Sequence, residues 1–533
     1  MKHLTLLSLS AVAVSNVANA QNTKTEQRPN ILLIICDDLI DYQGIYGGHP
    51  ASKTPNLDRL TKESVRFTNA HSIAPVSAPC RAALFTGIYP HVSGNLYFDP
   101  WFNNTVLSNS KTLMSHLRES GYQAYGTGKL LHRNLASEYS QFGLPEHYGP
   151  LPWNGTKAVP HPSIPPKFGA VPSIGPVDGT FASLADVPEV DGYRGWFERQ
   201  SNKPFRYVND DDRDLMRDEE HTIWAANKLS ELAKNQHNDP FYLAVGYVRP
   251  HTPLVVPQKF FDRFPLESVE VPEWVEGDAD DTYYKDANPG SRGYLAFNAM
   301  KEAYGENIRE GFRKYLQAYL ACVNFVDEEI GKLLNALDNS PFADNTIVIM
   351  TSDHGYDFGQ KEHFFKNSLW ETSTSVPFLV RLPKKQNAGK STSHPVSLID
   401  IYPTLVDYCG ITSDNRKNEN GARLCGYTLR ELLERPEANQ WSGSPVALSF
   451  VMREKKGGGY PPDASLLPQD QNYSVRSKDW RYIRYATGQE ELYYHVTDRG
   501  EVTNLADHPA HQEVKKQLIK ELYRLVPQLN EKR

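Results

Sequence analysis

Ile31-Leu32-Leu33-Ile34-Ile35-Cys36-Asp37-Asp38 is a short apolar run that ends in two acids. Two later stretches repeat this pattern: Phe241 to Tyr247 leads to His251, and Thr346 to Met350 leads to Asp353-His354. Such runs predict buried strands, and they alternate with helical patterns, which favours an α/β fold with a mainly parallel sheet. Ligands of open α/β sheets bind outside the carboxyl ends of the strands. We therefore expect three distant segments to deliver carboxylates and imidazoles to one edge of the sheet.

The acids at these strand ends predict a metal site. A lone Asp37-Asp38 pair is more often a simple exit from a strand into a loop. Here the pair follows a buried strand, where unpaired charges are costly, and Asp353-His354 repeats the arrangement on another strand. Oxygen-rich ligands suit a hard cation, calcium or magnesium, better than zinc. The two pairs together support a metal site more strongly than either pair alone.

The length of 533 residues, with 39% apolar content, fits one large domain plus an appendage. We expect a catalytic domain over residues 21–434 and an α+β subdomain over 435–533, because short strand patterns near Tyr473, Trp480 and Glu491 precede a helical pattern from about Pro509 to Leu529. Residues 133–220 and 267–305 are rich in Pro, Gly and polar residues. We interpret both as long loops that wall a substrate cleft.

The first 20 residues, MKHLTLLSLSAVAVSNVANA, have an early Lys2, an apolar run and a small-x-small ending. They predict a secretory signal peptide cleaved after Ala20, and hence an exported, periplasmic or secreted protein. The net charge of −7, without a Lys/Arg block, argues against nucleic acid as a partner, and no later apolar run is long enough to span a membrane. Among five cysteines, Cys409 and Cys425 flank a polar loop and are the only pair that suggests a disulfide.

The stretch from Val76 to Gly87 predicts a short helix with Ser77 as its N-cap, Pro79 in its first turn and Gly87 at its end. On capping alone, an ordinary structural helix is the better interpretation. The functional alternative is that the free N–H groups and the positive end of the helix dipole face an anion. Arg81 would then add a fixed cation.

Several motifs resemble those of one family. Ser77-Ala78-Pro79-Cys80-Arg81 matches the C/S-x-P-x-R signature of the type I, formylglycine-dependent sulfatases, and Leu84-Phe85-Thr86-Gly87 resembles its usual continuation. Gly128 to His132, Gly246 to His251 and Ser352 to Gly355 are similar to motifs of the iduronate-2-sulfatase branch and its bacterial polysaccharide-sulfatase relatives. The resemblance covers nearly all of the chain after Pro29. It implies an alkaline-phosphatase-like fold, with a large mixed, mainly parallel sheet flanked by helices and a smaller C-terminal α+β subdomain.

The resemblance also assigns roles to individual residues. It implies that one calcium ion is held by the modified residue 77 and by four further ligands, Asp37, Asp38, Asp353 and His354. It implies that four residues surround the sulfate group: Lys129, His132, His251 and Lys366. Arg81 would hold the formylglycine side chain in place. An isolated Lys or His would otherwise be taken as a surface or core residue, so these assignments depend on the motifs.

The chain departs from the commonest family pattern at residue 77, where Ser77 stands in place of cysteine. Cys80 cannot be the maturing residue in its own register, because Ala82 stands where the signature requires proline. The resemblance therefore implies a maturation enzyme that oxidises serine to formylglycine (3-oxoalanine). In this family the aldehyde hydrates to a gem-diol that attacks sulfur. His251 or Lys366 protonates the leaving alcohol, and His132 takes the proton when sulfate is expelled.

Two other functions remain as alternatives to a sulfatase. Phosphatases and phosphodiesterases of the alkaline phosphatase superfamily commonly use two metals, whereas lysines stand here at the corresponding places. An inactive carbohydrate-binding relative, with Ser77 never oxidised, is the non-enzyme alternative. The resemblance suggests a sulfated uronic acid, galactose or rhamnose in a glycosaminoglycan, ulvan or carrageenan, but kinship does not fix the sugar.

Overall fold

The computed structural model describes residues 28–41, 44–169, 174–198, 203–235, 239–453 and 467–530. The predicted signal peptide, residues 1–20, lies outside the described residues. No helix in the described part of the chain is long and apolar enough to cross a membrane.

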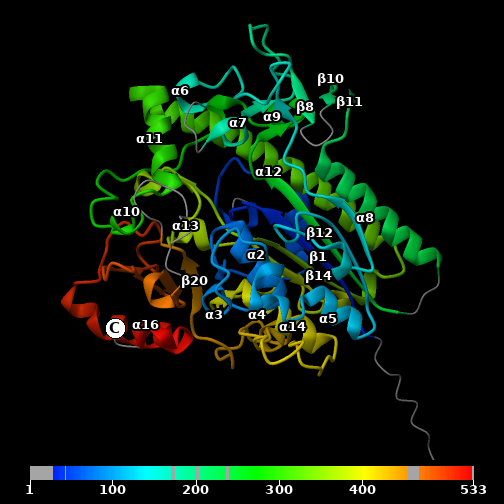
Figure 1. Cartoon of the computed structure of the whole chain (residues 1–533), viewed down its shortest axis with the longest axis vertical. Helices are drawn as coiled ribbons and strands as arrows, with labels where there is room; N and C mark the ends of the chain where they lie inside the picture. Colours follow the sequence, from blue (N-terminus) through cyan, green and yellow to red (C-terminus); the bar gives the residue numbers. More distant parts are fainter. Residues whose placement is uncertain are drawn as a thin grey trace, which may run out of the picture.

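The central sheet has eight strands in the order β18-β2-β17-β14-β1-β12-β4-β5. Figure 1 labels three of them, β1, β12 and β14, near the centre of the molecule. Their bounds are β1 (Asn30–Asp37), β2 (Val65–Phe67), β4 (Gln123–Gly128), β5 (Gln141–Pro145), β12 (Phe241–Pro250), β14 (Thr346–Ser352), β17 (Phe378–Arg381) and β18 (Ser391–Thr392). The five strands from β14 to β5 are parallel, whereas β17 runs antiparallel to both of its neighbours. The predicted mainly parallel sheet is therefore confirmed, and β1, β12 and β14 are the three strands expected from the apolar runs.

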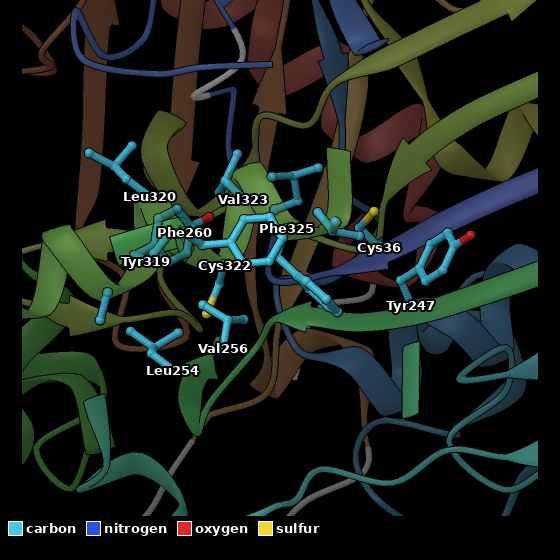
Figure 2. Packing of buried hydrophobic residues seen from close by; sticks show 14 of the residues in the cluster. Cys36, Tyr247, Leu254, Val256, Phe260, Tyr319, Leu320, Cys322, Val323 and Phe325 are labelled. Atoms are coloured by element: carbon cyan, nitrogen blue, oxygen red, sulfur yellow. The ribbon is translucent and has the colours of Figure 1, made fainter. Parts of the chain in front are cut away.

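Each central strand is buried on both faces, because alternate side chains point to opposite sides of the sheet. One face packs against α8 (Arg217–Lys234) and the long helix α12 (Ile308–Asp338). Figure 2 shows this side, where Cys322, Val323 and Phe325 of α12 lie among core residues that include Cys36 of β1 and Tyr247 of β12. The other face packs against α2 (Ser77–Thr86), α5 (Leu113–Glu119) and α14 (Ile401–Tyr408). The result is a three-layer α/β/α arrangement.

Smaller helices and strands surround these layers. The remaining helices are α1 (Pro55–Lys62), α3 (Pro90–Ser93), α4 (Thr105–Ser108), α6 (Pro166–Gly169), α7 (Gly175–Asp178), α9 (Gln258–Phe261), α10 (Tyr284–Ala287), α11 (Arg292–Tyr304), α13 (Glu371–Thr374) and α15 (Arg430–Glu434). The short strands are β3 (Ala70–His71), β6 (Leu151–Pro152), β7 (Phe181–Ser183), β8 (Trp196–Glu198), β9 (Lys203–Phe205), β10 (Tyr207–Asn209), β11 (Asp212–Arg213), β13 (Leu254–Val256), β15 (Asp357–Phe358), β16 (Phe364–Phe365) and β19 (Val396–Ser397).

The C-terminal subdomain is a four-stranded antiparallel sheet with one closing helix, as predicted. The sheet consists of β20 (Ala447–Val451), β21 (Asn472–Arg476), β22 (Trp480–Arg484) and β23 (Glu490–Tyr494), and the helix is α16 (Gln512–Leu525). A hairpin joins β22 to β23, and Gly488 supplies the positive φ of 92° in its turn. The boundary at residue 434 stays a prediction.

A buried group of charges joins this subdomain to the larger part of the chain. Arg481, which is fully buried on β22, forms ion pairs with Glu371 at the start of α13 and with Glu501. His495 lies 2.7 Å from Glu501, and Arg476 lies 3.1 Å from Glu371. Glu371 therefore meets two arginines across the junction, whereas Glu501 pairs within the subdomain, and these partners offset the cost of burying both carboxylates.

Three sequence-based expectations need correction. Residues 267–305 are not loop throughout, because α11 occupies Arg292–Tyr304 and buries Phe297 and Met300 among other apolar side chains. The Asn288-Pro289-Gly290 turn before α11 concealed this pattern. Cys409 and Cys425 are both free thiols rather than a disulfide. Finally, Val76 is the N-cap of α2 and Ser77 its first helical residue, so the Ser77 hydroxyl is not a cap.

Helix α2 ends at Gly87, which has the left-handed φ of 72° expected of a C-terminal glycine. We expect Gly87→Ala to lower the free energy of unfolding by about 2–4 kcal/mol, because a Cβ there would be strained and would also collide with Leu424 and press on Tyr402. Denaturant unfolding measures the change.

Gly94 is the matched control. It ends α3 with a φ of 76°, but nothing lies within 4 Å of a Cβ built on it. Gly94→Ala should therefore cost only the backbone strain, about 1–2 kcal/mol. Equal losses for the two variants would contradict the packing argument.

Candidate active site

Four parallel strands deliver polar residues to one edge of the sheet. Asp37 ends β1, Lys129 follows β4, His251 follows β12, and Asp353-His354 follows β14. These strands are neighbours in the order β14-β1-β12-β4, so their carboxyl ends meet. Lys129 thus carries the same strand-end signal as the three positions expected from the apolar runs.

The predicted metal ligands form one cluster. One ligand atom from each of Asp37, Asp38, Asp353 and His354 lies within 4.8 Å of the others, and all four residues are buried. The His354 ring is fixed by a 3.0 Å contact between its Nδ1 and the Gly355 carbonyl, so its Nε2 faces the carboxylates. Asp38 adopts an unusual left-handed φ of 63°. Three carboxylates and one imidazole fit a hard divalent cation such as calcium.

Ser77 lies beside this cluster at the first position of α2. Its Oγ is 3.0 Å from Asp37 Oδ1 and 3.2 Å from His354 Nε2. Its side chain therefore points at the expected metal ligands. The imidazole contact was missed in the sequence, because no residue near Ser77 along the chain suggests an adjacent base.

Three cations neutralise the aspartates. Arg81 is fully buried, donates from Nε to Asp353 at 2.8 Å and lies 3.3 Å from Asp37. Lys129 bonds to Asp37, and Lys366 reaches both oxygens of Asp38 at 2.5 and 2.7 Å. Burial alone would raise the pKa of Asp37, but the charges of Lys129 and Arg81 hold that pKa well below its usual value.

These residues open onto a cavity of about 540 Å³. Five of the predicted residues line it: Ser77, Lys129, His132, His251 and Lys366. The buried Arg81 stands behind this wall. Side chains from both segments predicted to wall a cleft also line the cavity, among them Glu146 and Tyr148 from residues 133–220 and Arg292 from residues 267–305. The structure thus brings together every predicted site residue.

His132 and His251, two of the histidines that line the cavity, are neutral at neutral pH. Burial, with Lys129 nearby, lowers the pKa of His132 to about 3. Burial, with Lys366 nearby, lowers the pKa of His251 to about 4. Nδ1 of His251 lies 2.6 Å from the Thr252 carbonyl, which leaves Nε2, 3.9 Å from Asp38, as the reactive nitrogen. Both rings can therefore accept a proton, and His251 must take one up before it can donate one.

Sequence reasoning missed Phe98, Glu146 and Arg292. Phe98 is an apolar wall that is 40% exposed and lies 4.9 Å from the His132 ring. Burial raises the pKa of Glu146. No local motif marks these three positions. Glu146 and Arg292 lie within segments assigned to the cleft wall, which was their only signal, whereas Phe98 lies in neither segment.

A second group of potential ligands lies at the junction with the C-terminal subdomain. It consists of Glu371, His495 and Glu501. This group offers two carboxylates and one imidazole, whereas the cluster beside Ser77 offers three carboxylates and one imidazole. Glu371 and His495 also line a larger cavity of about 1020 Å³, which contains none of the predicted site residues. Within the described residues, the cluster beside Ser77 is therefore the better metal site.

Comparison with known proteins identifies the family. The sulfatase family model matches residues 29–411, and the model for the C-terminal part of N-sulphoglucosamine sulphohydrolase matches residues 359–528. A sulfatase of Formosa agariphila is 30% identical over 522 residues, covering 95% of this chain and 88% of the relative. Iduronate 2-sulfatase of Homo sapiens is 26% identical over 524 residues, covering 89% of this chain and 88% of the relative.

Solved structures support the predicted alkaline-phosphatase-like fold. Phosphonate monoester hydrolase of Agrobacterium radiobacter aligns with a TM-score of 0.65 at 21% identity, covering 94% of this chain and 96% of that one. This likeness is one of fold, and enzymes with different activities share a fold. The family match, in contrast, spans well over half of the sequence and includes the whole cluster around Ser77. The chain therefore belongs to the sulfatase family and is a sulfatase enzyme.

Proposed function

We propose that this sulfatase removes sulfate esters from a sulfated carbohydrate, with residue 77 matured to formylglycine and with one calcium ion. The observation that carries the proposal is the cavity lined by Ser77 and by cationic side chains, with Ser77 bonded to the Asp37 cluster behind it. The substrates proposed are polysaccharides or oligosaccharides such as glycosaminoglycan, ulvan or carrageenan. Turnover of a panel of sulfated oligosaccharides tests the proposal, and hydrolysis of none of them would contradict it.

The proposed calcium ligands are residue 77 and the four clustered residues Asp37, Asp38, Asp353 and His354. When bound, calcium would supply positive charge that stabilises oxyanions at the reacting sulfate. The aldehyde of formylglycine, as its hydrate, supplies an oxygen nucleophile that an unmodified serine hydroxyl does not. An enzyme able to oxidise serine is the proposed maturation partner.

The chain's own residues bind the sulfate group and move protons. Lys129 and Lys366 project ammonium groups to the cavity edge, where they can hold sulfuryl oxygens. Arg81 anchors Asp37 and Asp353 from behind and keeps residue 77 oriented. His132, neutral through burial, is the proposed base that accepts a proton during sulfate release.

His251 is the proposed acid that protonates the departing alcohol. Aryl sulfates need little protonation of their leaving group, whereas sugar sulfates need much more. We therefore expect His251→Ala to lower kcat/KM by about 10²-fold or more for a sugar sulfate and by less than about 10-fold for 4-nitrophenyl sulfate. Steady-state kinetics on both substrates measures the difference.

Lys366 is the competing acid, since its Nζ reaches Asp38 in the same cavity. If Lys366 is the donor, Lys366→Met shows the leaving-group dependence and His251→Ala does not. Equal losses of the His251 variant on both substrates would instead indicate damage to binding or folding.

A hydrolase with an unmodified serine nucleophile is the second candidate, and the 3.2 Å contact between Ser77 Oγ and His354 Nε2 favours it. Such an enzyme would resemble the phosphatases and phosphodiesterases of the superfamily. Lysines at residues 129 and 366, beside the one potential metal cluster that adjoins Ser77 in the described residues, favour one metal and a sulfate monoanion instead. Turnover of aryl sulfate and of aryl phosphate, each after loading with calcium or zinc, separates the two.

We also propose that the protein is exported to the periplasm or secreted, with the signal peptide cleaved after Ala20. A polysaccharide is too large to enter the cell intact, so an external location agrees with the proposed substrate. N-terminal sequencing of the native protein tests the cleavage point. An inactive, carbohydrate-binding role would require residue 77 to stay unmodified.

A further inference from the structure

The cavity contains one cation that none of the proposed catalytic roles uses. Arg292 lines the same cavity as Ser77, and 44% of its side chain is exposed. Lys129 and Lys366 are bonded to the metal-cluster aspartates, whereas Arg292 pairs with Asp178. Arg292 is therefore held by a different carboxylate from those that bind the two lysines.

The backbone at Arg292 is fixed by a buried chain of hydrogen bonds. Asp357 Oδ2 lies 2.9 Å from His363 Nδ1, and His363 Nε2 lies 3.1 Å from Ser291 Oγ. Ser291 caps α11 by accepting from the Gly293 amide at 3.3 Å. A Cβ at Gly293 would collide with the His363 ring, so only glycine allows this approach. Arg292, between Ser291 and Gly293, is consequently the first residue of a firmly placed helix.

The side chain of Arg292 is held by neighbours of the proposed catalytic residues. One carboxylate oxygen of Asp178 forms an ion pair with the Arg292 guanidinium, and the other accepts a hydrogen bond from the Thr252 hydroxyl. Thr252 adjoins His251. The guanidinium also lies over the Phe365 ring at 5.4 Å, and Phe365 adjoins Lys366. Both oxygens of Asp178 are thus engaged. Among the described residues Asp178 is the one ion-pair partner of Arg292, so further N–H groups of the guanidinium remain for a ligand.

We propose that Arg292 binds a second anionic group of the substrate, in addition to the sulfate that is removed. A guanidinium fork matches the planar oxygens of a carboxylate and also binds a sulfate, and its charge is strengthened in a half-enclosed cavity. The substrate class is therefore a uronic-acid sulfate or a disulfated sugar rather than a neutral monosulfated sugar. This inference rests on the proposed function and names its substrate class.

The test measures binding rather than turnover. Calcium-loaded Ser77→Ala protein, which leaves sulfate esters intact, is titrated calorimetrically with matched monosaccharide sulfates in the gluco, galacto and ido series. In one pair the sugars differ only by a carboxylate in place of the hydroxymethyl group, and in the other by a second sulfate. In at least one series the more anionic member should bind about 10- to 100-fold more tightly. The pair that shows the preference identifies the anion as carboxylate or sulfate.

Adding Arg292→Gln should reduce that preference to about one, while Arg292→Lys should retain part of it because the charge remains. Arg309→Gln is the matched control. Arg309 also lies over an aromatic ring, that of Trp274 at 5.1 Å, but it lines the other cavity. The Arg309→Gln substitution should leave the preference for the more anionic sugar unchanged. Thermal melting verifies that each variant is folded. If Arg292→Gln does not fold, the comparison is made with Arg292→Lys instead.

The proposal is overturned if no anionic member is preferred in any series, if none binds measurably, or if the preference survives Arg292→Gln. Turnover of 4-nitrophenyl sulfate by matured wild-type protein is a separate measurement. If the matured protein did not hydrolyse 4-nitrophenyl sulfate, the proposed sulfatase chemistry would be contradicted and the binding result would still stand. The two ideas therefore fail independently.

Discussion

Wild-type protein from a host that matures only cysteine-type sulfatases should be folded but nearly inactive, whereas Ser77→Cys from the same host should be active. Oxidation of either side chain gives the same aldehyde, and a serine hydroxyl alone is a weak nucleophile. We expect kcat/KM of the two proteins to differ by roughly 10³-fold or more, because removal of a catalytic nucleophile lowers activity by at least this factor. Turnover of 4-nitrophenyl sulfate and the peptide mass at residue 77 measure it.

Ser77→Ala is the control and should be inactive from every host. The Ser77 hydroxyl contacts Asp37 and His354, so its loss should also cost about 1–3 kcal/mol of stability, which a denaturation curve detects. Full activity of Ser77→Ala, or of wild-type protein whose residue 77 has the mass of unmodified serine, would eliminate the formylglycine mechanism. The second outcome would support the Ser77-His354 pair as nucleophile and base.

Asp353→Ala should lower activity by about 10³-fold or more and abolish the stabilisation by calcium. Asp353 is fully buried in the proposed metal cluster, and its removal takes an anionic ligand from a dicationic site. Calcium that binds only the folded protein raises its melting temperature, which gives a readout that does not depend on activity. Wild-type turnover that survives exhaustive chelation, together with an active Asp353→Ala protein, would refute the metal assignment.

The alanine variant also leaves Arg81 without its 2.8 Å partner, and breaking a buried ion pair costs about 3–5 kcal/mol. Asp353→Asn separates the two effects, because it keeps the shape while removing the charge. The matched control is Asp327→Asn. Asp327 is equally buried but accepts bonds from Asn56 and Leu57 at the start of α1. The Asp327→Asn variant should have a lower free energy of unfolding, while calcium should still raise its melting temperature.

The sheet and the metal cluster could be predicted because they have local signals. An apolar run followed by acids marks β1 and β14, and Asp37 and Asp353 lie where those runs end. Lys366 has no such signal, because it follows a two-residue strand, and only the family motif pointed to it. Its neighbours Phe365 and Asn367 both have positive φ, a conformation that local propensity does not predict.

What the sequence concealed depends on contacts between distant segments. The sequence around Ser77 predicts an N-cap. In the structure, however, the Ser77 hydroxyl donates a hydrogen bond to Asp37, 40 residues away, instead of capping the helix. Arg292 is placed by the His363 ring, which meets Ser291 across 72 residues. Such long-range contacts leave no periodicity in the chain. They determine the proposed specificity of the site, whereas the local patterns determine its framework.

The charges shared by Glu371, Arg481 and Glu501 limit how this enzyme can be recombined with its relatives. A chimera that exchanged only the C-terminal subdomain would inherit Arg481 and Glu501 from one parent and the acid at residue 371 from the other. If the second parent lacks that acid, the buried Arg481 guanidinium keeps Glu501 but loses one of its two carboxylate partners. Glu371 also opens α13, a short distance along the chain from Lys366. Crossover points placed before Glu371 would keep the salt-bridged set together, and natural recombination within the family is expected to respect the same limit.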